Sequence, residues 1–215
     1  MTRRPTRTRR PPTRRSRRLN LPALAGIAVA ILALTAVVLT QGGDGETGPQ
    51  TGPVRVTGAT LPEFAEDGPD AAVGLSPPAL GGIDFAGEPS EVLPGGRPTL
   101  VLFAAHWCPH CRKELGTLSP WLRGGGAGDT DVVLVATATD PAAPNYPPSA
   151  WLERESWPGR VLLDDDADTA AHAYGVSGYP FFVFVDADGR VRERSSGELG
   201  TARVAASLAA MRSSP

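Results

Sequence analysis

Cysteine is nearly absent from this chain of 215 residues, with two copies, and histidine is hardly more frequent, with three. Two cysteines exclude both a scaffold of several disulfide bonds and a zinc site made of four cysteines. Aromatic residues make up only 6% of the chain, whereas glycine and proline number 25 and 22, which is typical of a chain that is partly linker. The hydrophobic fraction of 41% still suffices for one packed domain and excludes a wholly disordered chain.

Lysine is the scarcest charged residue, because 20 of the 21 basic residues are arginine and Lys113 is the exception. Residues 1–18 hold nine arginines and no acidic residue, whereas the rest of the chain holds 12 basic and 23 acidic residues. The net charge of −2 therefore hides a sharp division. A basic tail of this kind can bind nucleic acid. The apolar segment that follows it favours a different role, so we expect no nucleic-acid partner.

A long uncharged segment follows the arginines. Its core at 21–40 is 20 residues of mostly Ala, Leu, Val and Ile, enough for a helix of about 30 Å, the thickness of a bilayer's hydrocarbon layer. The positive-inside rule places the arginine-rich end in the cytoplasm. We therefore expect a cytoplasmic segment at 1–18 and a single-pass signal anchor at 19–41 in the plasma membrane. The end of the span is a poor match to a cleavage site, which favours a retained anchor over a cleaved signal peptide.

The remainder of the chain is expected outside the membrane. Residues 42–72 are rich in Gly, Pro, Thr and acidic residues and lack apolar periodicity, so they predict a flexible extracytoplasmic linker, in which 54–56 is a candidate short strand. A globular domain is expected over 73–215. Continuous apolar runs predict buried strands at 99–104, 131–136, 160–163 and 181–185.

Helical spacing separates these strands. Helices are expected at 112–122, 151–155, 168–174 and 201–211. Asp168 is expected to cap the third of them at its N-terminus. The Asp-Ala-Asp-Gly sequence at 186–189 predicts a hairpin turn into a last strand at 190–194. Strands that alternate with helices, followed by a hairpin and a helix, predict an α/β domain whose mixed sheet is covered on both faces.

The two cysteines lie at the junction between the first buried strand and the first helix, in the motif Trp-Cys-Pro-His-Cys at 107–111. The first turn of a helix carries unpaired N–H groups and a partial positive charge, which stabilise a thiolate at Cys108. Pro109 suits that turn and leaves Cys111 within disulfide range. Redox exchange without a metal or an organic cofactor is therefore the favoured chemistry. Two other interpretations stay open, namely buried structural thiols and a metal site that adds His106 and His110 to the cysteines.

These residues carry a family resemblance. The motif at 107–111, together with Gly-Tyr-Pro-Phe-Phe at 178–182, resembles the thioredoxin-fold thiol–disulfide oxidoreductases. The sequence at 186–190 makes the domain most similar to the membrane-anchored TlpA/ResA-like branch. The resemblance implies a thioredoxin-like α/β fold, with a central mixed sheet flanked by helices, after the single transmembrane helix. It also implies that Pro180 is cis and lies opposite the reactive cysteine, and that Tyr179 and Trp107 contact an extended substrate segment.

The direction of electron flow rests on two residues. Pro-His between the cysteines is the dipeptide of DsbA-like oxidising enzymes, and a charged His110 is expected to stabilise the reduced enzyme and so make it an oxidant. Glu114 instead matches a proton-handling glutamate of the reductive ResA-like enzymes, although a solvated helix residue is its simpler interpretation. The buried acid of thioredoxins is replaced here by Leu102. His106 is expected at the rim of the site.

We therefore expect a membrane-tethered thiol–disulfide oxidoreductase that acts on cell-envelope proteins, leans to oxidation, and depends on an unidentified redox partner. Cys108 attacks and Cys111 resolves the mixed disulfide. The chain is expected to be a monomer. A reductive ResA-like role, such as apocytochrome maturation, is the alternative, and a non-enzymatic metal-binding or redox-sensing protein is a further one. The expected catalytic residues are Cys108, Cys111, Pro180, His110 and Glu114.

Overall fold

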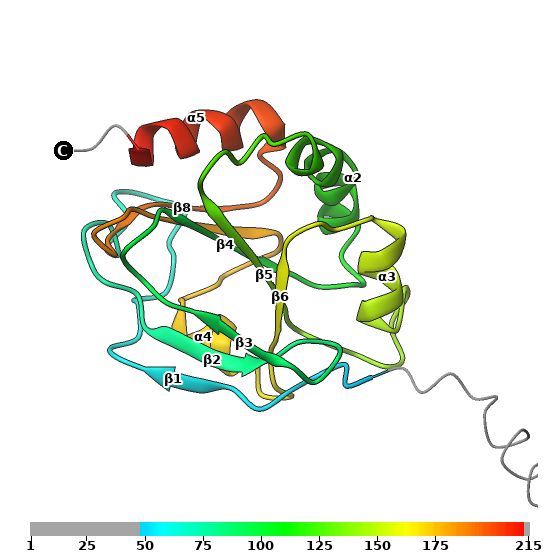
Figure 1. The fold of residues 1–215 in the computed structure, drawn as a ribbon. Helices are drawn as coiled ribbons and strands as arrows, with labels where there is room; N and C mark the ends of the chain where they lie inside the picture. Colours follow the sequence, from blue (N-terminus) through cyan, green and yellow to red (C-terminus); the bar gives the residue numbers. More distant parts are fainter. Residues whose placement is uncertain (1–47, 213–215) are drawn as a thin grey trace, which may run out of the picture. The chain divides into compact units, whose positions relative to one another are not determined.

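The computed structural model describes residues 48–212, drawn in colour in Figure 1. The expected cytoplasmic segment at 1–18 and the expected transmembrane anchor at 19–41 lie outside the described residues. Among residues 48–212, no helix has both the length and the apolar character that a membrane crossing requires.

The main sheet has five strands in the order β6-β5-β4-β7-β8. β4, β5 and β6 run parallel, and β7 and β8 continue the sheet antiparallel. All six residues of the central strand β4 are buried, which confirms the prediction of a strand covered on both faces. The strands are β4 (Thr99–Ala104), β5 (Asp131–Ala136), β6 (Arg160–Leu163), β7 (Phe181–Val185) and β8 (Val191–Ser196).

The side chains of β4 divide the core into two layers because successive residues of a strand point to opposite faces. Leu100 and Leu102 pack with three helices, α2, α3 and α5, whereas Val101 and Phe103 pack with α4 and a second, smaller sheet. Figure 1 shows α2 and α5 over one face of the sheet and α4 near the other. The helices are α2 (Pro109–Arg123), α3 (Pro148–Arg154), α4 (Thr169–Ala173) and α5 (Gly200–Arg212).

A smaller sheet was not predicted from the sequence, although its first strand overlaps the candidate short strand at 54–56. Its antiparallel strands follow the order β1-β2-β3, with β1 at Arg55–Thr57, β2 at Ala79–Ile83 and β3 at Pro89–Val92. The chain from residue 48 onward is packed on the domain, in contrast to the flexible linker expected over 42–72. Leu61 is buried and its amide donates to the carbonyl of Ala173 at 2.9 Å. Scattered apolar contacts and backbone hydrogen bonds hold this segment, and neither leaves a periodic pattern in the sequence.

A buried ion pair fastens the segment that joins β1 to β2. The Arg194 side chain is fully buried, and it donates through Nε and Nη2 to both carboxylate oxygens of Asp70, at 3.0 and 2.5 Å. Its Nη1 also donates to the carbonyls of Pro62 and Tyr174, both at 2.8 Å. Burial acts to raise the pKa of Asp70, but the hydrogen bonds from Arg194 and from the amide of Ala72, together with the charge of Arg194, outweigh it and hold that pKa below its usual range. The pair therefore ties residues 62–70 to β8.

The cap of α4 differs from the one expected. Asp168 has a left-handed backbone with a φ of 53°, and its side chain makes no hydrogen bond to the helix. Asp164 takes this role, because its two carboxylate oxygens accept from the amides of Ala170 at 2.8 Å and Ala171 at 3.1 Å. Asp168 instead accepts from the amide of Ala138 at 2.8 Å, which places it beside the segment that follows β5.

We predict that Arg194→Met lowers the free energy of unfolding by about 3–5 kcal/mol, because it leaves the carboxylate of Asp70 and two carbonyls without a buried partner. Denaturant unfolding can be followed by tryptophan fluorescence, since all four tryptophans lie between positions 107 and 157. Arg203→Met is the matched control: Arg203 pairs with Glu193 at an exposed position, so its loss should cost less than about 1 kcal/mol.

The same pair predicts a pH dependence. Because the folded pKa of Asp70 is depressed, its stabilisation is present at neutral pH and is lost as pH falls through the folded pKa. The stability difference between the parent chain and Arg194→Met should therefore narrow below about pH 4. A difference that stays constant from pH 7 to pH 3 would contradict this assignment.

Candidate active site

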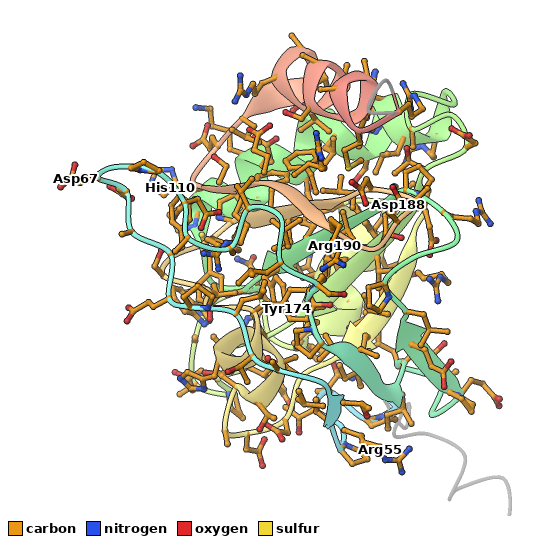
Figure 2. All side chains as sticks on the ribbon, turned by 90° about the vertical axis from the view of Figure 1, so that its left-hand side faces the viewer. Arg55, Asp67, His110, Tyr174, Asp188 and Arg190 are labelled. Atoms are coloured by element: carbon orange, nitrogen blue, oxygen red, sulfur yellow. The ribbon has the colours of Figure 1, made fainter. Side chains whose placement is uncertain are left out.

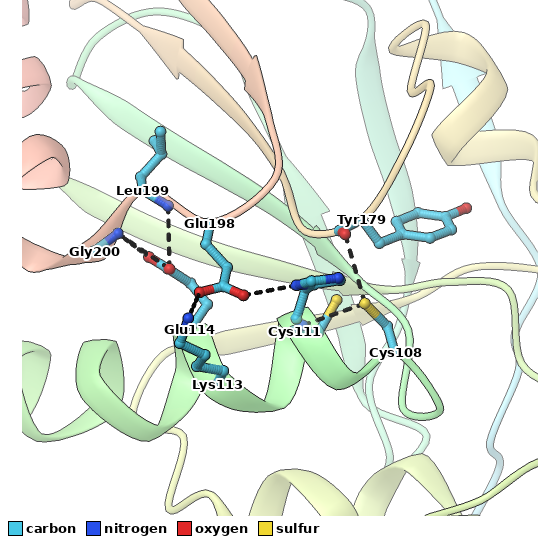
Figure 3. A network of polar contacts seen from close by, with 9 residues as sticks. Cys108, Cys111, Lys113, Glu114, Tyr179, Glu198, Leu199 and Gly200 are labelled. Atoms are coloured by element: carbon cyan, nitrogen blue, oxygen red, sulfur yellow. Dashed lines mark hydrogen bonds and ion pairs between the residues drawn. The ribbon is translucent and has the colours of Figure 1, made fainter.

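Cys108 stands where the central strand passes into α2, as the N-cap residue of that helix. Its sulfur accepts a hydrogen bond from the amide of Cys111 at 3.2 Å (Figure 3). The same sulfur donates to the carbonyl of Tyr179 at 3.5 Å, and both cysteines are free thiols in this structure. The amide points at the sulfur from the positive end of the helix, an arrangement that stabilises a negative charge there.

Cys111 lies one turn along the helix and is completely buried. Burial raises the pKa of the Cys111 thiol above its usual range, and the neighbouring Cys108 side chain raises it further. Cys111 therefore stays protonated at neutral pH. The two thiols thus have different environments: Cys108 has slight exposure and an amide donor, whereas Cys111 is enclosed in the core.

Pro180 and Tyr179 form the opposite wall of the site. The Tyr179–Pro180 peptide bond is cis, and the Tyr179 carbonyl faces the sulfur of Cys108. The indole of Trp107 meets the Tyr179 ring edge to face, with ring centroids 6.2 Å apart. Trp107 is 38% exposed, so an aromatic surface borders the cysteine pair. The structure thus brings Trp107, Tyr179 and Pro180 together around Cys108.

The backbone of Ala138 holds the indole of Trp107 in position. Its carbonyl accepts from Trp107 Nε1 at 2.7 Å, and its amide donates to the carboxylate of Asp168 at 2.8 Å. Asp168 therefore helps to hold the indole of Trp107 through the backbone of Ala138. Its position before α4 did not indicate this role. A left-handed φ of 50° at Ala138 directs the two groups in this way.

His106 is buried in the structure, whereas the sequence placed it at the rim. Its Nδ1 lies 2.8 Å from the carbonyl of Pro144, and its Nε2 accepts from the amide of Asp140 at 3.2 Å. Both ring nitrogens are thus engaged by the backbone of the loop after β5, and neither is available as a ligand beside the cysteines. Within residues 48–212, no group of three or more His, Cys, Asp or Glu side chains is arranged to hold a metal ion.

His110 lies at the periphery of the molecule, as Figure 2 shows, with 67% of its side chain exposed. Its Nδ1 is 2.7 Å from a carboxylate oxygen of Glu198, a residue of the loop between β8 and α5. The other oxygen of Glu198 pairs with Lys113 Nζ at 2.5 Å. The hydrogen bond from Lys113, followed by the one from His110, lowers the pKa of Glu198. Glu198 could not be identified from the sequence, because it lies 88 residues from its partner.

Glu114 is buried, which excludes the interpretation of a solvated helix residue. Its carboxylate accepts from the amides of Leu199 at 3.1 Å and Gly200 at 2.9 Å, the residues at which α5 begins. Burial raises the pKa of Glu114 in spite of these amide donors. The hydrogen bonds of this carboxylate are therefore with the start of α5, and none of them reaches a cysteine sulfur.

The arrangement can carry out thiol–disulfide exchange. Cys108 can attack a disulfide sulfur or be attacked as part of its own disulfide, and Cys111 lies close enough to complete the exchange. A stabilised thiolate at Cys108 is both an available nucleophile and a good leaving group.

We predict that iodoacetamide modifies Cys108 first in the native, reduced protein and reaches Cys111 only after unfolding, because Cys111 is enclosed and protonated. Peptide mass spectrometry measures both modifications. Cys108→Ser should remove insulin reduction and dithiol oxidation entirely, and its remaining thiol should alkylate slowly. Faster modification of Cys111 than of Cys108 in the native protein would reverse the two roles.

Comparisons with known proteins agree with this chemistry. Residues 58–209 match the family described as Redoxin. The thiol:disulfide interchange protein DsbE homolog of Paracoccus denitrificans is 28% identical over 134 residues, which cover 61% of this chain and 70% of that protein. The methylamine utilization protein MauD of Methylophilus methylotrophus is 32% identical over 130 residues, which cover 59% of this chain and 56% of MauD.

A similar solved structure is that of a putative thiol:disulfide interchange protein DsbE from Chlorobium tepidum, with a TM-score of 0.55 and 19% sequence identity. The similarity covers 65% of this chain and 96% of that one, and it shows the shared fold. From the family match, the cysteine geometry and the fold together, the chain belongs to the Redoxin family, has a thioredoxin-like fold, and is a thiol–disulfide oxidoreductase.

Proposed function

We propose that this protein is a membrane-tethered, extracytoplasmic oxidoreductase of the TlpA/ResA-like type that exchanges a Cys108–Cys111 disulfide with cell-envelope protein thiols and leans to oxidation. One observation carries the direction: the sulfur of Cys108 caps α2 and accepts the amide of Cys111 at 3.2 Å. Donors that favour the thiolate stabilise the dithiol form relative to the disulfide. An enzyme whose reduced form is favoured accepts electrons and acts as an oxidant.

In the oxidising direction, the enzyme disulfide is exchanged for a client disulfide in two steps. A client thiolate attacks the sulfur of Cys108, the Cys108–Cys111 bond breaks, and Cys111 leaves and takes up a proton, in keeping with its raised pKa. A second client thiolate then attacks the client sulfur of the mixed disulfide, and Cys108 leaves as a thiolate. Two electrons pass from the client to the enzyme, and the client gains a disulfide. A separate redox partner must then remove those electrons from the dithiol.

The contact between Cys108 and Tyr179 supports a client site at this wall. When Cys108 carries its proton, the thiol donates to the Tyr179 carbonyl at 3.5 Å. A thiolate or a disulfide sulfur at Cys108 has no S–H to donate, so in both of these forms the carbonyl is available to the backbone N–H of an extended client. The two reactive forms of Cys108 can therefore bind a client segment beside Trp107.

The tether is supported by the sequence. Nine arginines at 1–18 precede an uncharged span that is long enough to cross a bilayer. We infer a single-pass protein of the plasma membrane with a cytoplasmic N-terminus and an extracytoplasmic redox domain. Clients in that compartment are proteins whose cysteines form disulfides, which fits an oxidising environment.

A reductive role, such as apocytochrome maturation, is the second candidate. The carboxylate of Glu198 lies 2.7 Å from His110 and offsets the positive charge that favours an oxidant. Glu114 also occupies the position of the glutamate in the reductive ResA-like enzymes. The negative charges of these two residues act against the positive end of the helix, which stabilises the Cys108 thiolate. The reduction potential of the Cys108–Cys111 couple measures which effect is larger.

We predict that the Cys108–Cys111 couple has a potential above about −200 mV, on the oxidising side of thioredoxin at about −270 mV. His110→Ala should make the couple more reducing, because it removes from the first helical turn next to Cys108 an imidazole that can carry a positive charge. Equilibration with glutathione buffers, followed by alkylation and mass spectrometry, measures both potentials.

His172→Ala is the matched control, since His172 lies on α4 and its ring nitrogen Nδ1 lies 3.0 Å from the carbonyl of Ala167. It should leave the potential unchanged. If the parent couple is as reducing as thioredoxin and His110→Ala leaves it unmoved, the oxidising assignment fails and the reductive one replaces it.

A further inference from the structure

The loop between β8 and α5 is fixed to the active site at both of its ends. The amide of Gly197 donates to the carbonyl of Pro180 at 2.8 Å. At the other end, the amides of Leu199 and Gly200 donate to the carboxylate of Glu114 on α2. The loop therefore bridges the cis-proline turn and the helix that carries both cysteines, and Glu198 lies between these two attachments.

Glu198 also contacts α2, in the opposite direction along the same interface. Its two carboxylate oxygens lie 2.7 Å from His110 Nδ1 and 2.5 Å from Lys113 Nζ. Figure 3 shows Glu198 reaching from the loop toward Lys113 on α2. The helix and the loop are therefore joined in both directions. The carboxylate of Glu114 on α2 accepts from backbone amides at the end of the loop, and the carboxylate of Glu198 in the loop binds side chains of α2. Because the loop is fixed on both sides of it, Glu198 is directed toward the first two turns of α2.

We propose that Glu198 is a positioning residue of the redox centre, which holds the His110 ring through Nδ1, places a negative charge beside the helix turn that carries Cys108, and thereby adjusts the reduction potential of the Cys108–Cys111 couple. The proposal rests on disulfide exchange in either direction and does not depend on the direction proposed above.

The sign of the effect follows from the charges. Cations near Cys108 favour its thiolate and so the dithiol enzyme. The carboxylate of Glu198 places a negative charge against the Lys113 ammonium group and the His110 imidazole, and so reduces the positive potential at the sulfur. Removal of this negative charge makes the potential there more positive, so the dithiol becomes more favoured and the couple more oxidising.

Glu114 acquires a different role in this arrangement. Its carboxylate makes three hydrogen-bond contacts to two loop amides, so it fixes the position of Glu198. We therefore assign Glu114 as a second positioning residue, which acts on the cysteines through the loop. A glutamate that exchanged protons with Cys111 directly would change the couple independently of Glu198, and this difference can be measured.

The test measures the equilibrium constant for the reaction of the dithiol enzyme with oxidised glutathione, which gives the disulfide enzyme and two molecules of reduced glutathione. Glu198→Gln should lower this equilibrium constant about threefold, which raises the reduction potential by about 14 mV at 29.6 mV per tenfold change. Glu193→Gln is the matched control, because Glu193 lies on β8 and pairs with Arg203 and Ser207. It removes the same charge and should leave the constant unchanged. An unchanged constant in Glu198→Gln, or an equal shift in Glu193→Gln, would overturn the proposal.

Two double-mutant cycles test the pathway. In a His110→Ala background, Glu198→Gln should shift the constant by clearly less than threefold, because the partner of the carboxylate in the first turn of α2 is gone and only Lys113 remains. Glu114→Gln should shift it in the same direction as Glu198→Gln, and the two changes together should give less than the product of the single shifts. Independent shifts in the first cycle would contradict the role of Glu198. Independent shifts in the second would return Glu114 to a direct role at Cys111.

Folding does not obscure the result. Glu198 has a partly exposed side chain, so Glu198→Gln and the His110 cycle are expected to yield folded protein, which far-ultraviolet circular dichroism can verify. If Glu114→Gln fails to fold, the His110 cycle alone decides the role of Glu198. The outcomes also separate this proposal from the oxidising function, because it predicts a shift relative to the parent couple, whatever the potential of that couple.

Discussion

The structure depends on the central strand β4, whose six residues are buried and whose end delivers Cys108 to the N-terminus of α2. Strands on both sides fix β4 by main-chain pairing, and helices cover both faces, so the position of the sulfur is set by the core of the domain. The amide of Cys111 then points at this sulfur. The difference between the two thiols follows from this one junction, because the first cysteine lies at the helix end and the second lies inside the core.

Two carboxylates link this junction to the rest of the site. Glu114 reaches from α2 to the amides that begin α5, and Glu198 reaches back from the loop to His110. The same loop contacts Pro180, so the cysteine helix and the cis-proline turn share one support. The electrostatics of the cysteines therefore depend on residues near the C-terminal end of the chain as well as on the motif itself.

The sequence predicted what is local and failed where partners are distant. The apolar runs and the motif at 107–111 are complete within one segment, so the strands, the strand–helix junction and the cysteine pair could be predicted. The pairing of Arg194 with Asp70 joins residues 124 apart, and that of His110 with Glu198 joins residues 88 apart. Only the assembled fold creates such contacts, which is why the packed segment from residue 48 and the role of Glu198 could not be predicted from the sequence.

We propose that Cys108 forms mixed disulfides with proteins outside the cytoplasm. The most direct test expresses the full chain with Cys111→Ser in intact cells, quenches thiols with acid, and separates disulfide-linked adducts from the membrane fraction. We expect reductant-sensitive adducts on Cys108 with extracytoplasmic proteins, because the resolving thiol is absent. The matched Cys108→Ser chain should give none. Equal amounts of adduct in both variants, or adducts only with cytoplasmic proteins, would contradict this assignment of Cys108.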